Sequence, residues 1–242
     1  MLTWNTYMLR NAGRFATSGP CLPPSFLIMA LVFGCRPARQ TKCRRAAACV
    51  QLFAATAPLL DDPAENLLAV SAFNDDGLAG FVDGTLDAGR LVRSDFFPGL
   101  GWMLTRSLWQ ELQPKWPDQY WDDWLRGPEN RRGREMIRPA ISRTLHYGIQ
   151  GTSNNQFGSH LDRIVLADED IALAASWATF DAPSMSKAVY ERRYLDNVRS
   201  SEQVQLEQLR RPNAALSVNK EWCVPVSAHD AMLPLCWQRS AV

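Results

Sequence analysis

The chain has 242 residues, a formal net charge of +1 and a hydrophobic content of 46%. This length is sufficient for one large domain or two small ones, and the hydrophobic content is ordinary for a globular protein. The near-zero charge argues against a dedicated nucleic-acid binder, because such proteins usually carry a basic excess. We therefore expect no nucleic-acid partner.

Residues 1–60 differ in composition from the rest of the chain. They contain seven Lys or Arg, no Asp or Glu, and four of the six cysteines. An arginine-rich, acid-free N-terminus resembles a targeting segment. The apolar run at residues 26–33 is shorter than the roughly 20 residues that span a bilayer. It fits a signal-peptide core, a marginal anchor, or a segment that is not a native part of the domain, and the sequence leaves these alternatives open.

The middle of the chain alternates between patterns typical of strands and of helices. Residues 67–73 form a short apolar run that ends at the turn-forming residues 74–77, which predicts a buried strand. Weaker strand candidates and extended pieces follow at residues 81–82, 91–92, 137–139 and 144–147. Strands interleaved with helices indicate an α/β domain.

Two helices are predicted around a glycine-containing turn. Pro98-Gly99-Leu100-Gly101 is typical of a tight turn, and apolar residues at helical spacing follow over residues 103–112. Pro117 and Asp118 are typical of a helix start, so a second helix should carry residues 120–125. Residues 184–211 also have a helical pattern, whereas the tail that follows has none.

A pair of carboxylates lies between tryptophans, in Trp121-Asp122-Asp123-Trp124. Aromatic rings beside carboxylates suit a sugar, because its C–H faces stack on indoles while its hydroxyls need charged acceptors. Neighbouring residues on a helix point about 100° apart, so both carboxylates cannot face one substrate. One could act while the other caps or pairs. The alternative is a solvated acidic pair near a helix start.

Other candidate motifs are weaker. The acidic triplet 168–170 has the Asp-x-Asp form that holds a metal on a diphosphate in many sugar-nucleotide transferases, but we interpret it as a solvated turn. The arginine group at 131–134 is a solvated face or a phosphate contact. The three histidines form no metal spacing, and neither a nucleophile elbow nor a phosphate-binding glycine loop is present.

Several motifs occur in one order over roughly residues 57–200: Asp95–Trp102, Glu111–Pro117, Trp121–Trp124, Ile137–Pro139 and Ser142–Thr144. Together they resemble the catalytic domain of the N-acetylglucosaminyltransferase I family. The resemblance implies a Golgi type II membrane enzyme with a lumenal catalytic domain of the GT-A kind. Such an enzyme moves GlcNAc from UDP-GlcNAc to a mannose 2-hydroxyl of an N-glycan with inversion, and uses Mn²⁺ on the diphosphate.

The resemblance also implies roles for individual residues. An inverting transfer needs one base that takes the proton of the acceptor hydroxyl. The family's base position falls on Asp122, and its substrate-binding positions fall on Ser153, Trp121, Leu100 and Gly151, with Arg134 near the site. The Ser- and Asn-rich composition of residues 148–158 independently suits a loop that closes over the donor.

The chain departs from the family in two respects. The family's acidic metal-binding motif lies upstream of the segment that begins near Leu59, and residues 1–60 contain no carboxylate. Because Mn²⁺ prefers oxygen donors, its usual site is missing. Two positions that are disulfide-linked cysteines in the family are Ala69 and Met136 here.

These departures lead to a prediction of domain organisation and to three functional hypotheses. We predict an unassigned basic segment at residues 1–56, a partial catalytic domain at 57–183, and a helical segment with a divergent tail at 184–242. The catalytic part would be the C-terminal half of a GT-A-like fold. The chain is then a truncated transferase that is inactive alone, a catalytically dead relative that binds a glycan or a partner, or a fragment that cannot fold by itself.

Overall fold

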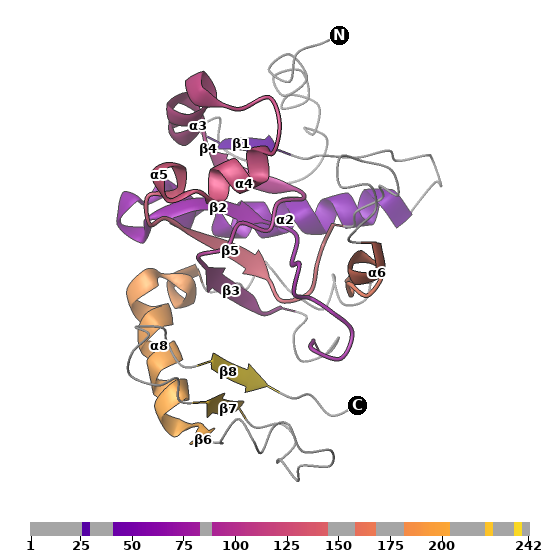
Figure 1. Cartoon of the computed structure of the whole chain (residues 1–242), viewed down its shortest axis with the longest axis vertical. Coiled ribbons are helices and arrows are strands. Elements are labelled where there is room, and N and C mark those ends of the chain that lie inside the picture. Colours follow the sequence, from indigo (N-terminus) through magenta and orange to yellow (C-terminus); the bar gives the residue numbers. More distant parts are fainter. Residues whose placement is uncertain are drawn as a thin grey trace.

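The computed structural model describes residues 26–29, 41–82, 89–144, 158–167, 182–203, 221–224 and 235–238. Within these residues the fold is mixed α/β, as predicted. A long helix, α2 (Thr41–Asp61), lies against a five-stranded sheet, and helix α8 (Lys187–Ser200) lies with a three-stranded sheet at one end of the molecule (Figure 1).

The five-stranded sheet has the order β1-β4-β2-β5-β3. Strand β2 pairs parallel with β5 and antiparallel with β4, so the sheet is mixed. The three-stranded sheet has the order β6-β7-β8. The strands are β1 (Phe26–Met29), β2 (Leu67–Ser71), β3 (Leu91–Ser94), β4 (Trp102–Thr105), β5 (Glu135–Pro139), β6 (Glu202–Gln203), β7 (Glu221–Val224) and β8 (Leu235–Gln238).

The remaining helical elements are all short. Most of them connect strands of the five-stranded sheet, and three are single 3-10 turns. They are η1 (Pro63–Glu65), α3 (Arg106–Leu112), η2 (Gln113–Lys115), α4 (Trp121–Arg126), α5 (Pro128–Arg131), α6 (Gly158–Leu161) and η4 (Ala182–Met185).

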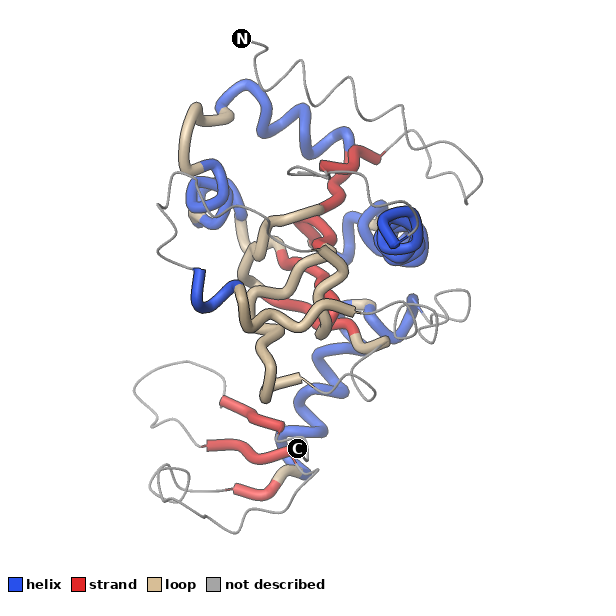
Figure 2. The backbone as a smooth tube through the Cα atoms, turned by 90° about the vertical axis from the view of Figure 1, so that its right-hand side faces the viewer, coloured by secondary structure: helices blue, strands red, loops and turns tan. Residues whose placement is uncertain are grey.

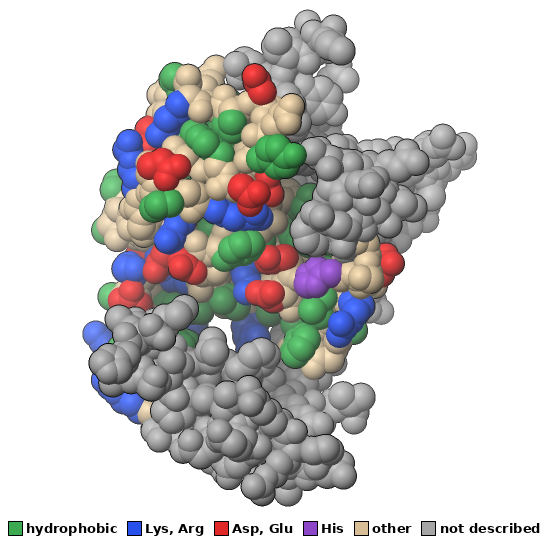
Figure 3. Space-filling view, viewed as in Figure 1, with side chains coloured by type: hydrophobic (Ala, Val, Ile, Leu, Met, Phe, Trp, Pro, Cys, Tyr) green, Lys and Arg blue, Asp and Glu red, His purple; other side chains and the backbone are tan. Residues whose placement is uncertain are grey.

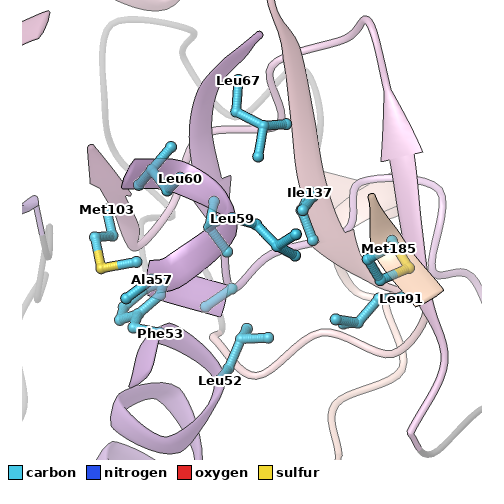
Figure 4. Packing of buried hydrophobic residues seen from close by; sticks show 12 residues of the cluster. Leu52, Phe53, Ala57, Leu59, Leu60, Leu67, Leu91, Met103, Ile137 and Met185 are labelled. Atoms are coloured by element: carbon cyan, nitrogen blue, oxygen red, sulfur yellow. The ribbon is translucent and has the colours of Figure 1, made fainter. Parts of the chain in front are cut away.

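One hydrophobic core lies between α2 and the sheet. Figure 2 shows α2 end-on at one side of the strands. Leu52 and Leu59 of the helix, with exposures of 0% and 7%, pack in the same cluster as Met103 and Ile137 of the sheet, both fully buried (Figure 4). Met185 of η4 closes this cluster, so the segment before α8 also contributes to the core.

The sequence predicted several elements correctly and misplaced others. Strands β2, β3 and β5 confirm the predicted strands at residues 67–73, 91–92 and 137–139. The predicted helix over residues 103–112 is wrong in its first part, because residues 102–105 form β4 and α3 begins at Arg106. All of Trp102–Leu104 is buried, and a strand covered on both faces has no alternation to distinguish it from a buried helix.

Two further predictions need correction. Helix α4 begins at Trp121 and not near Pro117, and its N-cap is Tyr120 with φ of 51° and no side-chain cap. The patternless tail contains strands β7 and β8. Helix α8 ends at Ser200, and residues 204–211 of the predicted helix lie outside the described residues. Residue 82 forms only an isolated bridge.

Two observations concern the N-terminal third. Helix α2 runs without a break across residue 56, where we predicted a domain boundary, and that division remains a prediction. Residues 26–29 of the apolar run form β1 and pair with β4. No helix in the described part of the chain is both long and apolar enough to cross a membrane.

A buried arginine fastens the start of α8 to the sheet. Arg93 of β3, with 3% of its side chain exposed, donates hydrogen bonds to Glu65 and Glu135 and to the Met185 carbonyl, over 2.7–2.9 Å. Lys187 donates its Nζ to Glu135 at 2.9 Å and its backbone N–H to Glu65 at 2.6 Å. The two carboxylates therefore compensate the burial of the guanidinium, which would otherwise be costly.

The network predicts a pH-dependent loss of stability in Glu135→Gln. Burial raises the pKa of the Glu135 carboxyl, but the hydrogen bonds of Lys187 and Arg93 outweigh this and leave the pKa below 4.5. A carboxyl group whose pKa is lower in the folded protein stabilises the fold at pH values above its pKa in the unfolded chain. This stabilisation is lost as the pH falls through the pKa of the folded protein. We expect Glu135→Gln to cost about 2 kcal/mol at neutral pH.

Thermal unfolding of both proteins across the acid range measures this effect. The difference in melting temperature should shrink as the pH falls below about 4.5. Glu191→Gln is the control, because Glu191 pairs with Lys187 at 54% side-chain exposure and is outside the buried network. A difference that does not change with pH would contradict the assignment.

The parallel pairing of β2 and β5 yields a second prediction. Ala69 and Met136 are register partners, and both are fully buried. These are the two positions that the family resemblance gives as disulfide-linked cysteines. Because adjacent strands lie about 4.8 Å apart, we expect the double variant Ala69→Cys/Met136→Cys to form an intrachain disulfide on oxidation. Peptide mapping after thiol alkylation should find the two segments linked, and neither single variant should give this peptide.

Candidate functional site

Asp122 lies in the first turn of α4, beside the arginine that ends the same helix. Its Oδ2 accepts a hydrogen bond from Arg126 at 3.2 Å, and Oδ1 of Asp123 accepts one from the same nitrogen at 2.6 Å. The side chain of Asp122 is 41% exposed and that of Asp123 is 71% exposed. The guanidinium of Arg126 thus pairs with both carboxylates, and Asp122 is the less exposed of the two.

The predicted glycine turn is present and lies against α4. Gly99, Leu100 and Gly101 have φ of 74°, 44° and 79°, so three consecutive residues are left-handed. A Cβ on Gly99 would lie 4.0 Å from Cη2 of Trp121, which places the turn directly against the residue before Asp122. The structure therefore brings together Leu100, Trp121 and Asp122, which the sequence analysis assigned to one site.

Hydrogen bonds from the sheet and from Thr144 hold this turn. Ser71 Oγ donates to the Gly99 carbonyl at 2.8 Å, and the Ala72 N–H donates to the Gly101 carbonyl at 2.8 Å. Thr144 Oγ1 donates to the Leu100 carbonyl at 2.7 Å. All three carbonyls of the turn are satisfied, so its strained backbone is fixed by β2 and by the segment after β5.

Arg126 connects the turn to the carboxylates. Its Nε donates to the Phe97 carbonyl at 3.0 Å, and its guanidinium carbon lies 4.5 Å from the ring centroid of Phe96. Figure 3 shows acidic, basic and hydrophobic side chains side by side on the face that carries α4 and α5. Sequence reasoning missed Arg126, although its spacing of three and four residues from the two aspartates is the usual signal of helical ion pairs.

The tryptophans near the site pack mainly against each other. Trp121 lies nearly parallel to Trp102 and Trp116, with ring centroids 5.8 and 5.9 Å away. Trp116 makes edge contacts with Trp109 and Trp124. Trp102 and Trp109 are buried and Trp121 is partly buried. Packing therefore explains the crowding of tryptophans, and Trp121 and Trp124, which flank the aspartates, are partly buried against this cluster.

Arg134 is engaged by a carboxylate. Its guanidinium donates to Glu111 Oε2 at 2.7 Å and to Oε1 at 3.4 Å, and Arg132 lies 3.1 Å from the same carboxylate. The hydrogen bond from Arg134 holds the pKa of Glu111 below its usual value. Arg131 lies 3.9 Å from Asp95. The arginine group thus forms ion pairs in the structure, and a substrate contact of Arg134 stays a prediction.

A further carboxyl lies within electrostatic reach of the site. Burial and the neighbouring Asp76 raise the pKa of Asp75, which follows β2, and Arg138 and Arg126 act in the opposite direction. The Asp75 carbonyl lies 2.8 Å from Nε2 of His160. The sequence analysis treated Asp75 as an ordinary turn residue, because nothing in its local pattern signals burial.

Several predicted residues cannot be placed. Gly151, Ser153 and the acidic triplet 168–170 lie outside the described residues. Among the residues that are described, no group of three or more His, Cys, Asp or Glu side chains could hold a metal ion. The described residues therefore offer no site that fits the Mn²⁺ that the family implies.

Together, the fold and the site define an α/β domain in which a half-exposed carboxylate follows a tryptophan that lies against a glycine turn. Comparison with known proteins identifies the family of this domain. The model of the GNT-I family matches residues 46–227, about three quarters of the chain, and the chain belongs to this family. The family resemblance seen in the sequence is thereby confirmed, and by family the chain is related to glycosyltransferases.

A curated relative supports the same family. The chain is 44% identical over 154 residues to the alpha-1,3-mannosyl-glycoprotein 2-beta-N-acetylglucosaminyltransferase of Arabidopsis thaliana. The match covers 63% of this chain and 33% of the relative. The chain thus spans about a third of the length of this relative.

The glycine turn predicts a specific stability pattern. A Cβ on Gly101 would lie 2.8 Å from Cγ2 of Thr144, whereas a Cβ on Gly133 would meet nothing within 4 Å, and both glycines have positive φ. Gly133→Ala should cost about 1 kcal/mol for the left-handed backbone alone. Gly101→Ala should cost more, because the methyl group also displaces Thr144 from its bond to Leu100.

Urea unfolding of both variants measures the difference. Thr144→Ser removes the obstructing methyl group and keeps the hydroxyl, so Gly101→Ala/Thr144→Ser should recover to the level of Gly133→Ala. Equal losses in the two alanine variants, or no recovery in the double variant, would contradict the predicted contact.

Proposed function

We propose that the protein containing this chain is an inverting glycosyltransferase with a GT-A-like fold. It moves GlcNAc from UDP-GlcNAc to the 2-hydroxyl of a mannose in an N-glycan, and this chain supplies the acceptor side with the base. Family membership supports the class of reaction. The observation that carries the proposal is the position of Asp122, which is half-exposed, paired with Arg126 and adjacent to the turn that presents Leu100.

One carboxylate is sufficient for this chemistry. The acceptor oxygen forms a bond to the anomeric carbon as the bond from that carbon to the diphosphate breaks, and the hydroxyl proton passes to the base. Asp122 takes this role in the proposal, because it follows Trp121, which lies against the turn, and is 41% exposed, whereas Asp123 is 71% exposed. Leu100 and the exposed part of Trp121 would line the sugar pocket.

The donor side depends on other parts of the protein. We place the donor loop at Gly151 and Ser153 by family resemblance, and Arg134 near it. Mn²⁺ would supply charge neutralisation of the leaving diphosphate in the family's chemistry. The Golgi lumen remains the expected compartment on the same basis.

A catalytically inactive relative is the second candidate. The composition of residues 1–60, which contain no Asp or Glu, motivates this candidate. Such a protein would bind a mannose-containing glycan or a partner through Asp122, Asp123 and the tryptophans beside them, and would transfer nothing. Glycan binding without turnover in the full-length gene product would favour this candidate.

The proposal predicts a strong effect of Asp122→Asn. In the full-length gene product, the variant should lower kcat by roughly 10²–10⁴-fold, the usual contribution of general base catalysis. Binding of UDP-GlcNAc, measured by calorimetry, should persist, because the base contacts the acceptor. Asp123→Asn should retain most of the turnover. Retained transfer by Asp122→Asn, or equal losses in both variants, would reject the assignment of the base.

A further inference from the structure

We propose that Arg126 is a positioning residue that fixes Asp122 at the acceptor hydroxyl. This inference rests on the proposed function and deepens it. The guanidinium contacts neither reacting atom in this proposal. It acts through Asp122, and its effect is to hold the carboxylate at a constant distance from the turn that contains Leu100.

Helix α4 cannot fix the carboxylate by itself. It has six residues, and its N-cap Tyr120 provides no side-chain hydrogen bond. Helices this short are marginal without tertiary contacts, because nucleation fixes several residues for few hydrogen bonds. An exposed aspartate in the first turn of such a helix would sample several rotamers. A contact from a side chain that is itself anchored outside the helix is therefore needed to select one.

Arg126 provides this contact from a rigid anchor. Its Nε donates to the carbonyl of Phe97 at 3.0 Å, and Phe97 is fully buried in the cluster that contains Trp102 and Trp109. Its Nη1 binds Asp122 at 3.2 Å, and its plane lies over Phe96 at 4.5 Å. The same Nη1 also binds Asp123 at 2.6 Å, so four contacts hold the planar guanidinium, which in turn holds the Asp122 carboxylate.

The geometry distinguishes positioning from direct ligand binding. Two nitrogens of the guanidinium are committed to protein oxygens, and the side chain is only 27% exposed. Replacing a residue that binds the donor diphosphate would raise the KM for the donor. A residue that only orients the base would change kcat and leave both KM values as they are.

The experiment compares Arg126→Gln, Arg126→Lys and Arg126→Ala in the full-length gene product. Arg126→Gln should lower kcat by about 10²-fold with unchanged KM for both substrates, the cost of a misplaced catalytic group. Arg126→Lys should be intermediate, because its ammonium keeps the charge but cannot bind Phe97 and Asp122 as a fork. Added guanidinium at non-denaturing concentration should restore part of the Arg126→Ala turnover.

Two comparisons complete the design. Arg126→Gln should add nothing to the loss in Asp122→Asn, because both act on the same group. Arg132→Gln removes an arginine that is 55% exposed and pairs with Glu111, and it serves as the control for loss of a surface cation. Melting temperatures identify any variant that fails to fold, in which case Arg126→Lys and the rescue of Arg126→Ala decide the question.

Each outcome is decisive. Wild-type kcat in Arg126→Gln, a loss explained by a raised KM, or a loss that adds fully to that of Asp122→Asn would overturn the positioning role. Any of these three outcomes leaves the proposed function intact if the wild type transfers GlcNAc and Asp122→Asn does not. If the wild type transfers nothing, or Asp122→Asn is fully active, the proposed function fails and the inference fails with it.

Discussion

The burial of strand β2 on both faces is the constraint on which the two cores and the candidate site depend. Residues 68–71 all have an exposure of 0%. Leu67 and Val70 pack in the cluster that contains residues of α2. Leu68 and Ala69 pack in a second cluster, with Phe97, Trp102 and Trp109. Fully burying one aliphatic side chain stabilises a protein by about 2 kcal/mol, so this strand holds the two layers together. The strand also ends at Ser71, whose hydroxyl and following N–H bind the glycine turn.

Two arginines at the edges of this framework show how burial changes the role of a charge. Arg93 is almost completely enclosed and has two carboxylates and two carbonyls around it. Removing one charged partner would leave the buried guanidinium incompletely compensated, at a cost of about 2 kcal/mol, and the network is therefore a structural element. Arg126 is more exposed, and its carboxylate partners reach solvent. A ligand can approach that pair, whereas it cannot approach Arg93.

The sequence predicted the mixed α/β class, the strand at β2 and the turn before β4, because each has a strong local signal. The apolar run at residues 67–73 and the glycines at 99 and 101 report directly on burial and on backbone conformation. Strand β4 was misread since both of its faces are buried and its apolar residues continue into α3. The mutual packing of the tryptophans was not predicted for a related reason: residue type gives no information about whether an indole faces a ligand or another indole.

Family motifs assigned Asp122, Trp121 and Leu100 to one site, and their roles stay predictions. The structure places the glycine turn that contains Leu100 against Trp121, the residue before Asp122. The detailed geometry of this region was not predictable from the sequence. Neither local pattern nor family position indicated that the Phe97 carbonyl would anchor Arg126. That contact joins residues 29 apart in the chain and depends on how the turn packs against α4. Long-range contacts of this kind follow from the packing of the two elements and have no periodic signature.

Two residues near Asp122 have a strained backbone conformation. Non-glycine residues in the left-handed region cost about 1–2 kcal/mol each, and they persist where the surrounding structure fixes them. Among the described residues, four have such a conformation: Asn66, Leu100, Tyr120 and Arg132. Two of these, Leu100 and Tyr120, lie on either side of the same small region, one in the turn and one directly before Trp121 and Asp122. A fold that needed only to connect β3 to β4 and α3 to α4 could use relaxed backbone at both points. Strain in both segments, which meet at Trp121 beside Asp122, is what a site with a required geometry would keep.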